Sequence, residues 1–341
     1  GYKDIGSRLP IIQGTSFAFI PVMAPFKAAG LGAVFTAAFI GGIFQIFIGK
    51  ILKPIRHLFP PLVTGIVVLM IGVSLLKVGF MYAGGGGWLM NNKPEIFGNA
   101  NHLTIAFTVL IVAIIFNIKG KGMVSSASIL IGMIAGYIVA MFFGMVNYGK
   151  IASAGWFAFP SPLQYGIEFV PGAIILMLFM AVVTTIETIG DISATTMGGD
   201  NREATNKELS GGIMADGVGT AFGALFNAMP NTSYSQNAGL VAFTGVISRH
   251  VGTVAGIILI LMGLFPKLGG IIAAMPESVI GGAAIIMFGL ITSAGIKLIA
   301  RSEMNQRNLL ILGLSLSFGI GMSLLPQFVA HIPDFGISLK L

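Results

Sequence analysis

Two acidic side chains stand near the end of a long apolar run, where a charge is costly. Glu187 and Asp191 follow the apolar residues Ile174–Val183 and lie four positions apart. On a helix this spacing places both carboxyls on one face. A charge at the centre of a membrane helix costs roughly 2.5–3.5 kcal/mol, so such an acid is a candidate for function. Two close carboxyls in a low dielectric resist being ionised together, which suits the uptake and release of a proton.

Asp216 is a third acidic residue that the apolar pattern isolates. It follows two glycines at the start of a short apolar segment, Gly211–Met229. Stabilisation of a helix N-terminus is an alternative to a functional role for this residue. For Glu187 and Asp191 the corresponding alternative is that they cap the cytoplasmic end of their helix.

A polar stretch, Pro230–Gly239, interrupts the apolar sequence later in the chain, and seven of its ten residues carry a hydroxyl or amide side chain. A matching pattern lies near the start, because Thr15–Ala18 and Thr232–Ser235 both read Thr-Ser-aromatic-small. Polar backbone at membrane depth is tolerated only where protein or a water-filled cavity satisfies it. Two interrupted apolar segments at corresponding places in two halves predict the binding site of a transporter. Two ordinary polar loops are the alternative.

The composition identifies an integral membrane protein. Of the 341 residues, 55% are apolar and 9% are charged, whereas a soluble domain carries roughly a quarter charged residues. The chain has no cysteine, which excludes disulfide frameworks, iron–sulfur clusters and cysteine-based zinc sites. Its net charge of +7 comes from Lys and Arg scattered through short loops. Positive loops on one face of a membrane explain that charge without nucleic-acid binding.

Apolar segments of roughly 20 residues mark the candidate membrane crossings. Most Lys and Arg in the loops fall on one side of these segments, which is placed inside. The sequence therefore predicts a multi-pass protein of the inner or plasma membrane. The eleven candidate segments are Pro10–Ala29, Leu31–Gly49, Leu62–Tyr82, Leu103–Ile118, Ala127–Val146, Val170–Gly190, Gly211–Met229, Gly239–His250, Val251–Leu268, Ser278–Ala300 and Asn308–Leu325.

The segment Gln236–Gly245 resembles the signature of the nucleobase–ascorbate transporter family, also called the second nucleobase–cation symporter family. That signature reads Gln/Glu/Pro, Asn, any residue, Gly, four of any kind, Thr, then Arg/Lys/Gly. Gly14–Phe19, Glu187–Asp191 and Asp216–Thr220 are similar to further motifs of the family, in the same order. The resemblance covers essentially the whole chain.

The resemblance implies an all-α polytopic membrane protein, an inverted-repeat transporter with fourteen segments and two short mid-membrane strands. The strands are expected at Ser16–Phe19 and Ser233–Gln236. The family's first two segments and its last are expected to lie outside this sequence, which we interpret as part of a longer protein. A shortened member of the family that does not transport is the alternative. The implied division is a core domain at 1–56 and 169–272 and a gate domain at 57–168 and 273–341.

The resemblance also implies roles for single residues. Gln at 236, rather than Glu, and Asp at 191, rather than His, are similar to the purine branch of the family, with a uracil-type permease as the alternative. Substrate is expected to be held by the side chains of Glu187 and Gln236, flanked by Phe17 and Tyr234, and met by backbone groups of Ser235 and Ala18. Proton coupling and the geometry of the site are expected to depend on Asp191, Asp216, Asn237, Ser16 and Thr244.

We therefore predict a transporter, not an enzyme, that takes up xanthine or urate with protons and alternates its access between the two sides of the lipid bilayer. Sodium stays open as the coupling ion. A homodimer is expected, with no cofactor, no metal and no nucleic acid. One alternative is an anion carrier of the sulfate or bicarbonate type with the same fold. Another is an intramembrane aspartyl hydrolase that uses Asp191 and Asp216 as a dyad.

Overall fold

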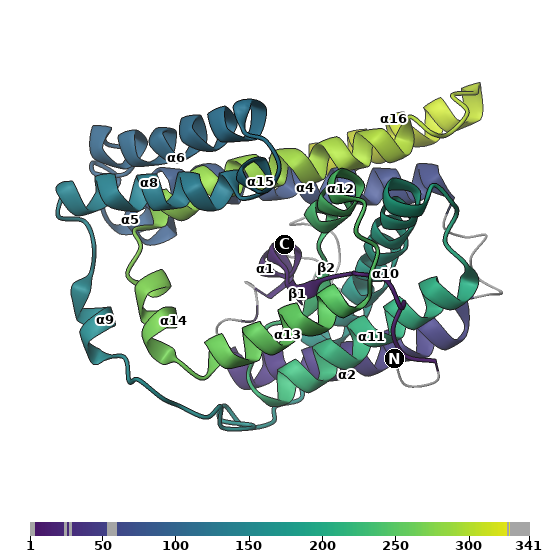
Figure 1. The fold of residues 1–341 in the computed structure, drawn as a ribbon, viewed down its shortest axis with the longest axis horizontal. Coiled ribbons are helices and arrows are strands. Elements are labelled where there is room, and N and C mark those ends of the chain that lie inside the picture. Colours follow the sequence, from purple (N-terminus) through teal and green to yellow (C-terminus); the bar gives the residue numbers. More distant parts are fainter. Residues whose placement is uncertain (1–3, 24–25, 27–28, 53–59, 326, 328–341) are drawn as a thin grey trace. The chain divides into compact units, whose positions relative to one another are not determined.

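The structure, a computed structural model, describes residues 4–23, 26, 29–52, 60–325 and 327. The chain divides into two compact units. Unit 1 contains Gly1–Ile71, Pro160–Val254 and Ser293–Leu341, and unit 2 contains Gly72–Phe159 and Ala255–Thr292. The described part is mainly helical, as the composition predicts (Figure 1).

Except for Ser16 and Tyr234, which directly precede a helix, the predicted site residues lie on the helices of unit 1. These helices are η1 (Phe17–Phe19, a 3-10 helix), α1 (Ile20–Met23), α2 (Leu31–Lys50), α10 (Pro171–Asp200), α11 (Asn206–Leu225), α12 (Ser235–Thr244) and α16 (Gln306–Leu324). Unit 2 contains α5 (Gly87–Asn92), α6 (Ala100–Lys119), α7 (Met123–Ser126), α8 (Ser128–Phe142), α9 (Tyr148–Ser153) and α14 (Pro266–Ala273). Residues of α4 (Pro61–Ala83), α13 (His250–Gly263) and α15 (Glu277–Ile299) belong to both units.

Six helices of the described chain are long and apolar enough to cross a membrane, and a seventh crossing results if the bent pair α13 and α14 counts as one. Each of the eleven predicted segments contains at least one helix. Outside the six, α11 is 20 residues long but not apolar enough, and the other helices are short or broken. The six are α2, α4, α6, α10, α15 and α16.

Two short strands, β1 (Gln13–Thr15) and β2 (Asn231–Ser233), form an antiparallel pair in which Gly14 lies opposite Thr232. Figure 1 shows them side by side although they come from opposite parts of the sequence. The prediction of two strands is thus confirmed. Because each has only three residues, the pair serves to hold two chain segments together rather than to build a sheet.

The predicted bounds of the strands, Ser16–Phe19 and Ser233–Gln236, are wrong by two to four residues. In the structure Ser16 is the N-cap of η1, and its hydroxyl accepts a hydrogen bond from the Ala18 N–H. Tyr234 likewise directly precedes α12. Serine competes for backbone N–H groups and so favours the start of a helix over the continuation of a strand.

Glycines allow α2 and α11 to pack with their backbones in contact. A Cβ atom at Gly42 would lie 2.6 Å from the Ala221 nitrogen, and one at Gly217 would lie 2.6 Å from the Gly42 oxygen. Further along the same contact, the Ser210 hydroxyl donates to the Gly49 carbonyl over 2.6 Å. Small residues of this kind let membrane helices approach closely. The contact fixes the position of Asp216, the residue before Gly217.

Unit 2 is held by the same kind of packing. On α8, Gly132 and Gly136 face α6, where a Cβ at Gly132 would lie 2.6 Å from the Val109 oxygen. Ser278 of α15 and His102 of α6 share a hydrogen bond of 2.6 Å between Oγ and Nδ1, and both side chains are buried. The apolar core around them includes Ile105, Val109, Ala140, Val279 and Ala283.

Candidate functional site

The helix α10 places Glu187 and Asp191 inside the protein. It begins at Pro171, a residue whose fixed φ suits the first helical position. It ends at Asp200, where Asn201 adopts the left-handed conformation that commonly closes a helix. Glu187 and Asp191 are therefore interior residues of the helix and do not cap its end. Both are buried, with 4% and 7% of their surface exposed.

Hydroxyl groups of β2 meet these two acids. Thr232 Oγ1 donates to Glu187 Oε2 over 3.2 Å, and Ser233 Oγ donates to Asp191 Oδ2 over 2.6 Å. Thr232 and Ser233 are buried as well. The strand pair therefore does more than join two segments, because it fixes the hydroxyls that satisfy the carboxyls of α10.

Asp216 joins the same cluster from α11. It lies in the interior of that helix, not at its N-terminus, and none of its surface is exposed. Thr188 Oγ1 lies 3.3 Å from Asp216 Oδ2 and 3.3 Å from Ser233 Oγ. The three acids that the sequence singled out are thus brought together around Thr188 and the residues of β2.

Gln45 of α2 is a member of the cluster that the sequence analysis missed. Its Nε2 donates to Asp216 Oδ2 over 2.8 Å and to Thr184 Oγ1 over 3.4 Å, and only 2% of the residue is exposed. The sequence does contain a signal for this role, because Gln45 is an amide side chain between Phe44 and Ile46 in an apolar helix. A polar side chain in such a helix faces protein or water rather than lipid.

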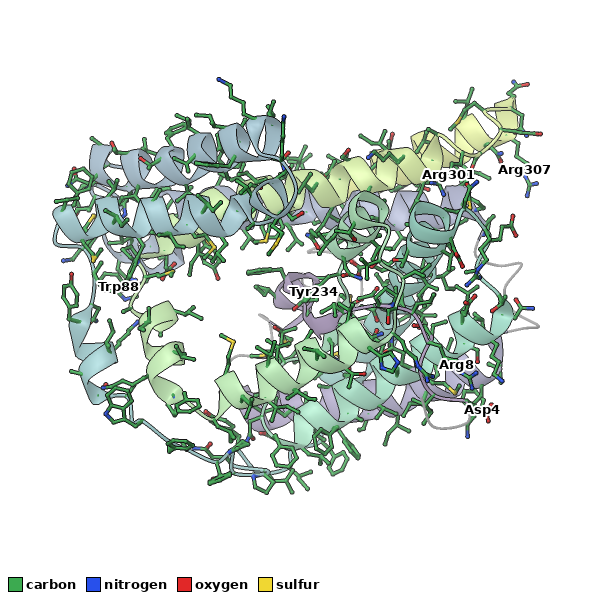
Figure 2. All side chains as sticks on the ribbon, in the orientation of Figure 1. Asp4, Arg8, Trp88, Tyr234, Arg301 and Arg307 are labelled. Atoms are coloured by element: carbon green, nitrogen blue, oxygen red, sulfur yellow. The ribbon has the colours of Figure 1, made fainter. Side chains whose placement is uncertain are left out.

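Tyr234 and Phe17 lie just after the last residues of β2 and β1. The Tyr234 hydroxyl donates to the Thr15 carbonyl over 3.2 Å, and 37% of the residue is exposed (Figure 2). Its ring lies across Gly14, where a Cβ atom would be 2.9 Å from Tyr234 Cζ. Phe17 starts η1, and Ala18 beside it is buried with its N–H turned to the Ser16 hydroxyl.

The remaining predicted residues lie on α12. Ser235 and Gln236 form its first turn, and Gln236 is exposed, with no side-chain hydrogen bond to another described residue. Asn237 Nδ2 donates to the Pro10 carbonyl, which ties α12 to the segment before β1. Thr244, at the far end of the helix, donates to the Leu240 carbonyl of its own helix over 2.9 Å. The structure therefore does not bring Thr244 to the cluster.

No described residue gives the cluster of acids a positively charged partner. Both ion pairs of the described chain involve Arg202, whose guanidinium contacts Asp200 at 2.7 Å and Glu208 at 2.6 Å in the loop between α10 and α11. Those hydrogen bonds lower the pKa of Glu208 from 4.5 to about 2 and raise the pKa of Arg202. Among the described residues, no group of three or more His, Asp or Glu side chains could hold a metal ion.

This arrangement bears on the two alternatives raised by the sequence. An anion site is built from cations, backbone N–H groups and helix N-termini, whereas this cluster contains three acids. An aspartyl dyad needs two carboxyls that share a proton directly, whereas here two hydroxyls, of Ser233 and Thr188, stand between Asp191 and Asp216. The geometry fits a site that handles protons and a neutral or proton-donating ligand.

Comparison with known protein families gives one match across most of the chain. A family model described as the Permease family (Xan_ur_permease) matches residues 3–328. CPE0397 of Clostridium perfringens is 37% identical over 335 residues, which cover 98% of this chain and 73% of that protein. The xanthine permease XanP of Escherichia coli is 34% identical over 348 residues, covering 98% of this chain and 75% of XanP.

The uric acid transporter UacT of Escherichia coli is 35% identical over 339 residues, which cover 97% of this chain and 69% of UacT. Among solved structures, the transmembrane domain of the cyanobacterial bicarbonate transporter BicA has a similar fold, with a TM-score of 0.68 at 17% identity over 96% of this chain and 86% of that one. SLC26A9 gives a TM-score of 0.60 at 14% identity over 95% of this chain and 57% of that one. At such identities the two structures bear on the fold alone.

Proposed function

Since this chain belongs to the permease family that includes xanthine permeases and a uric acid transporter, we propose that it takes up an oxidised purine, xanthine or urate, by proton symport. The chain is a multi-pass protein of the plasma membrane and a permease rather than an enzyme. Which purine it carries, which ion drives it and which residues hold the substrate are the parts that we propose.

The observation that carries the proposal is the contact between the buried Glu187 and β2, the strand that leads into α12. Thr232 holds the Glu187 carboxyl, and the exposed Tyr234 and Gln236 follow two and four residues later. A dioxopurine presents alternating N–H donors and carbonyl acceptors on one edge. A carboxylate accepts from N–H groups, and a carboxamide both donates and accepts. Glu187 and Gln236 together therefore complement that edge.

Aromatic and backbone groups complete the proposed site. Phe17 and Tyr234 would lie against the two faces of the flat purine, and stacking of a base on an aromatic ring contributes roughly 1–3 kcal/mol. Backbone groups of Ser235 and Ala18 would meet its edges. Asn237 and Ser16 would keep the two broken segments in place, since each forms a hydrogen bond within or between them.

Proton coupling is proposed for the acids behind the substrate. Asp191 and Asp216 lie beyond Glu187, in a cluster that contains no described cation. When one of these acids takes up a proton, an uncompensated negative charge is removed from the low-dielectric interior before the protein changes its access from one side of the membrane to the other. We propose alternating access by motion of a core domain (1–56 and 169–272) against a gate domain (57–168 and 273–341), in a homodimer. Sodium in place of the proton is the alternative for the ion.

Uptake of radiolabelled xanthine and urate by the full-length protein in proteoliposomes tests the proposal. An inward acid pH gradient should drive uptake, and Glu187→Gln should lower it by on the order of 100-fold, because a charged hydrogen-bond acceptor is lost. Sulfate and uracil should not compete with the labelled purine. Competition by sulfate or uracil would favour the anion-carrier or uracil alternative. Undiminished uptake by Glu187→Gln would refute the assigned site.

A further inference from the structure

An unbroken line of side-chain oxygens connects Asp191 to Asp216. Asp191 Oδ2 lies 2.6 Å from Ser233 Oγ, Ser233 Oγ lies 3.3 Å from Thr188 Oγ1, and Thr188 Oγ1 lies 3.3 Å from Asp216 Oδ2. All four residues are buried, and Thr188 and Asp216 have no exposed surface. The line therefore runs through the protein from α10 and β2 to α11.

Thr188 differs from most other hydroxyl residues of α10. The hydroxyls of Thr184, Thr185 and Ser193 each donate to the carbonyl four residues earlier in the same helix, over 3.0, 2.7 and 2.7 Å. Such a bond is the usual choice of a hydroxyl within a helix. The Thr188 hydroxyl lies instead between two side chains from other elements, Asp216 and Ser233.

The number of protons decides what this line can do. It contains three oxygen–oxygen contacts, but the two hydroxyls supply only two hydrogens. If both acids are ionised, one contact holds no hydrogen, and two oxygen atoms face each other in a buried place. If one acid carries a proton, each contact holds one hydrogen, and all hydroxyls point the same way along the line. The proton can sit on either acid, because reversing both hydroxyls gives the second arrangement.

The contacts around the two acids fit an arrangement with the proton on Asp216. The 2.6 Å bond from Ser233 to Asp191 has the length of a hydroxyl bonded to an ionised carboxylate. At the other end, Asp216 Oδ1 is buried and has no hydrogen-bond partner among the described residues. A buried oxygen without a hydrogen-bond partner raises the free energy of the folded protein more on a charged carboxylate than on a neutral one. The geometry thus fits an ionised Asp191 and a protonated Asp216.

Within the part of the chain that the structure describes, the surroundings provide no other charge that could neutralise the acids. Glu187 on α10 is the third acid of the cluster, and it faces Thr232. The elements β1, β2 and α12 contain no charged residue, and α2 brings the neutral Gln45. Lys50 at the end of α2 and Lys207 and Glu208 at the start of α11 lie outside the line.

We propose that Thr188 and Ser233 relay a proton between Asp191 and Asp216, and that these two acids share one proton during transport. This inference rests on the proposed proton symport. Starting from ionised Asp216, the protonated Asp191 gives its proton to Ser233 Oγ, Ser233 gives its own to Thr188 Oγ1, and Thr188 gives its own to Asp216 Oδ2. Each hydroxyl gains one proton and loses one, so only the two acids change charge.

The test compares two measurements on the full-length protein in proteoliposomes with radiolabelled xanthine. The first is the initial rate of uptake driven by an inward acid gradient, which requires net proton movement. The second is exchange of labelled for unlabelled xanthine at equal pH on both sides, which does not. Thr188→Val removes the hydroxyl at nearly constant volume. We expect the gradient-driven rate to fall by on the order of 100-fold, as for loss of a positioned proton-transfer group, and exchange to fall far less.

Matched variants separate a relay from a structural role. Thr188→Ser keeps the hydroxyl and should restore the gradient-driven rate. Thr185→Val removes an equally buried hydroxyl that bonds only within its helix, and should behave as the unmodified protein. If Thr188→Val does not fold, the same comparison is made at Ser233, where Ser233→Ala removes the hydroxyl and Ser233→Thr keeps it.

Three results would overturn the relay. An unchanged gradient-driven rate in Thr188→Val would show that the hydroxyl is not needed, and equal losses in both measurements would show a structural role. Both leave the proposed function intact. Uptake by the unmodified protein that ignores the pH gradient would refute proton symport itself and the relay with it.

Discussion

Replacing Gln45 by Met tests how the acid cluster is held. The substitution keeps the length of the side chain but removes the donor that lies 2.8 Å from Asp216 Oδ2. Asp216 Oδ1 has no partner among the described residues, so only Thr188, 3.3 Å away, would still bind this carboxyl. Leaving a buried polar group without its hydrogen bond costs about 1–3 kcal/mol. We expect the free energy of unfolding to fall by that amount.

A double-mutant cycle isolates the contribution of the pair. The free energy of unfolding is measured by circular dichroism in mixed micelles for the unmodified protein, Gln45→Met, Asp216→Ala and the double variant. Side chains in direct contact give an interaction energy of about 0.5–3 kcal/mol, whereas independent sites are additive. The control is Gln13→Met, since the Gln13 amide donates to the Gly212 carbonyl and not to Asp216. An additive result for Gln45 and Asp216 would refute the hydrogen bond as a source of stability.

Two further predictions concern the substrate and pH. Gly14→Ala should displace the Tyr234 ring, because the new Cβ would lie 2.9 Å from Tyr234 Cζ. Unlabelled xanthine should then compete roughly tenfold more weakly with uptake of labelled xanthine, which is within the range of a lost stacking contact. Gly239→Ala, with open space around its Cβ, is the matched control, and equal affinities of the two variants would contradict the role of Tyr234. Glu208→Gln should lower stability at neutral pH, because Arg202 lowers the pKa of Glu208 from 4.5 to about 2. A group with a depressed pKa stabilises the folded state above about pH 4.5 and ceases to do so as the pH falls towards 2. The free energies of unfolding of the two proteins, measured by chemical unfolding, should therefore converge over that interval. A difference that stays constant with pH would be evidence against a stabilising Glu208–Arg202 pair.

The sequence predicted the parts of the site that stand out from an apolar background. Glu187, Asp191 and the stretch Pro230–Gly239 are visible because charge and hydroxyl groups are rare in membrane segments. The matching patterns singled out the two broken segments, and the structure shows that β1 and β2 within them pair. The family also followed from motifs within these same stretches.

Other features depend on contacts that a sequence does not display. Gln45 and Asp216 are 171 residues apart, and nothing in the local pattern around either residue names the other as its partner. The bounds of the first strand were wrong because the choice between a fourth strand residue and a helix cap depends on a single hydroxyl, that of Ser16. The division into core and gate domains stays a prediction.

The strand pair has a consequence for biosynthesis. Thr15 meets Tyr234, and 219 positions separate them. At a synthesis rate of about 5–20 residues per second, β1 is made roughly 10–45 s before its partner exists. During that interval its N–H and C=O groups have no strand to bind, which the hydrocarbon interior does not tolerate. The first broken segment must therefore stay in the translocon or in contact with water until β2 has been made. The binding site is complete only after the second half of the chain has been inserted.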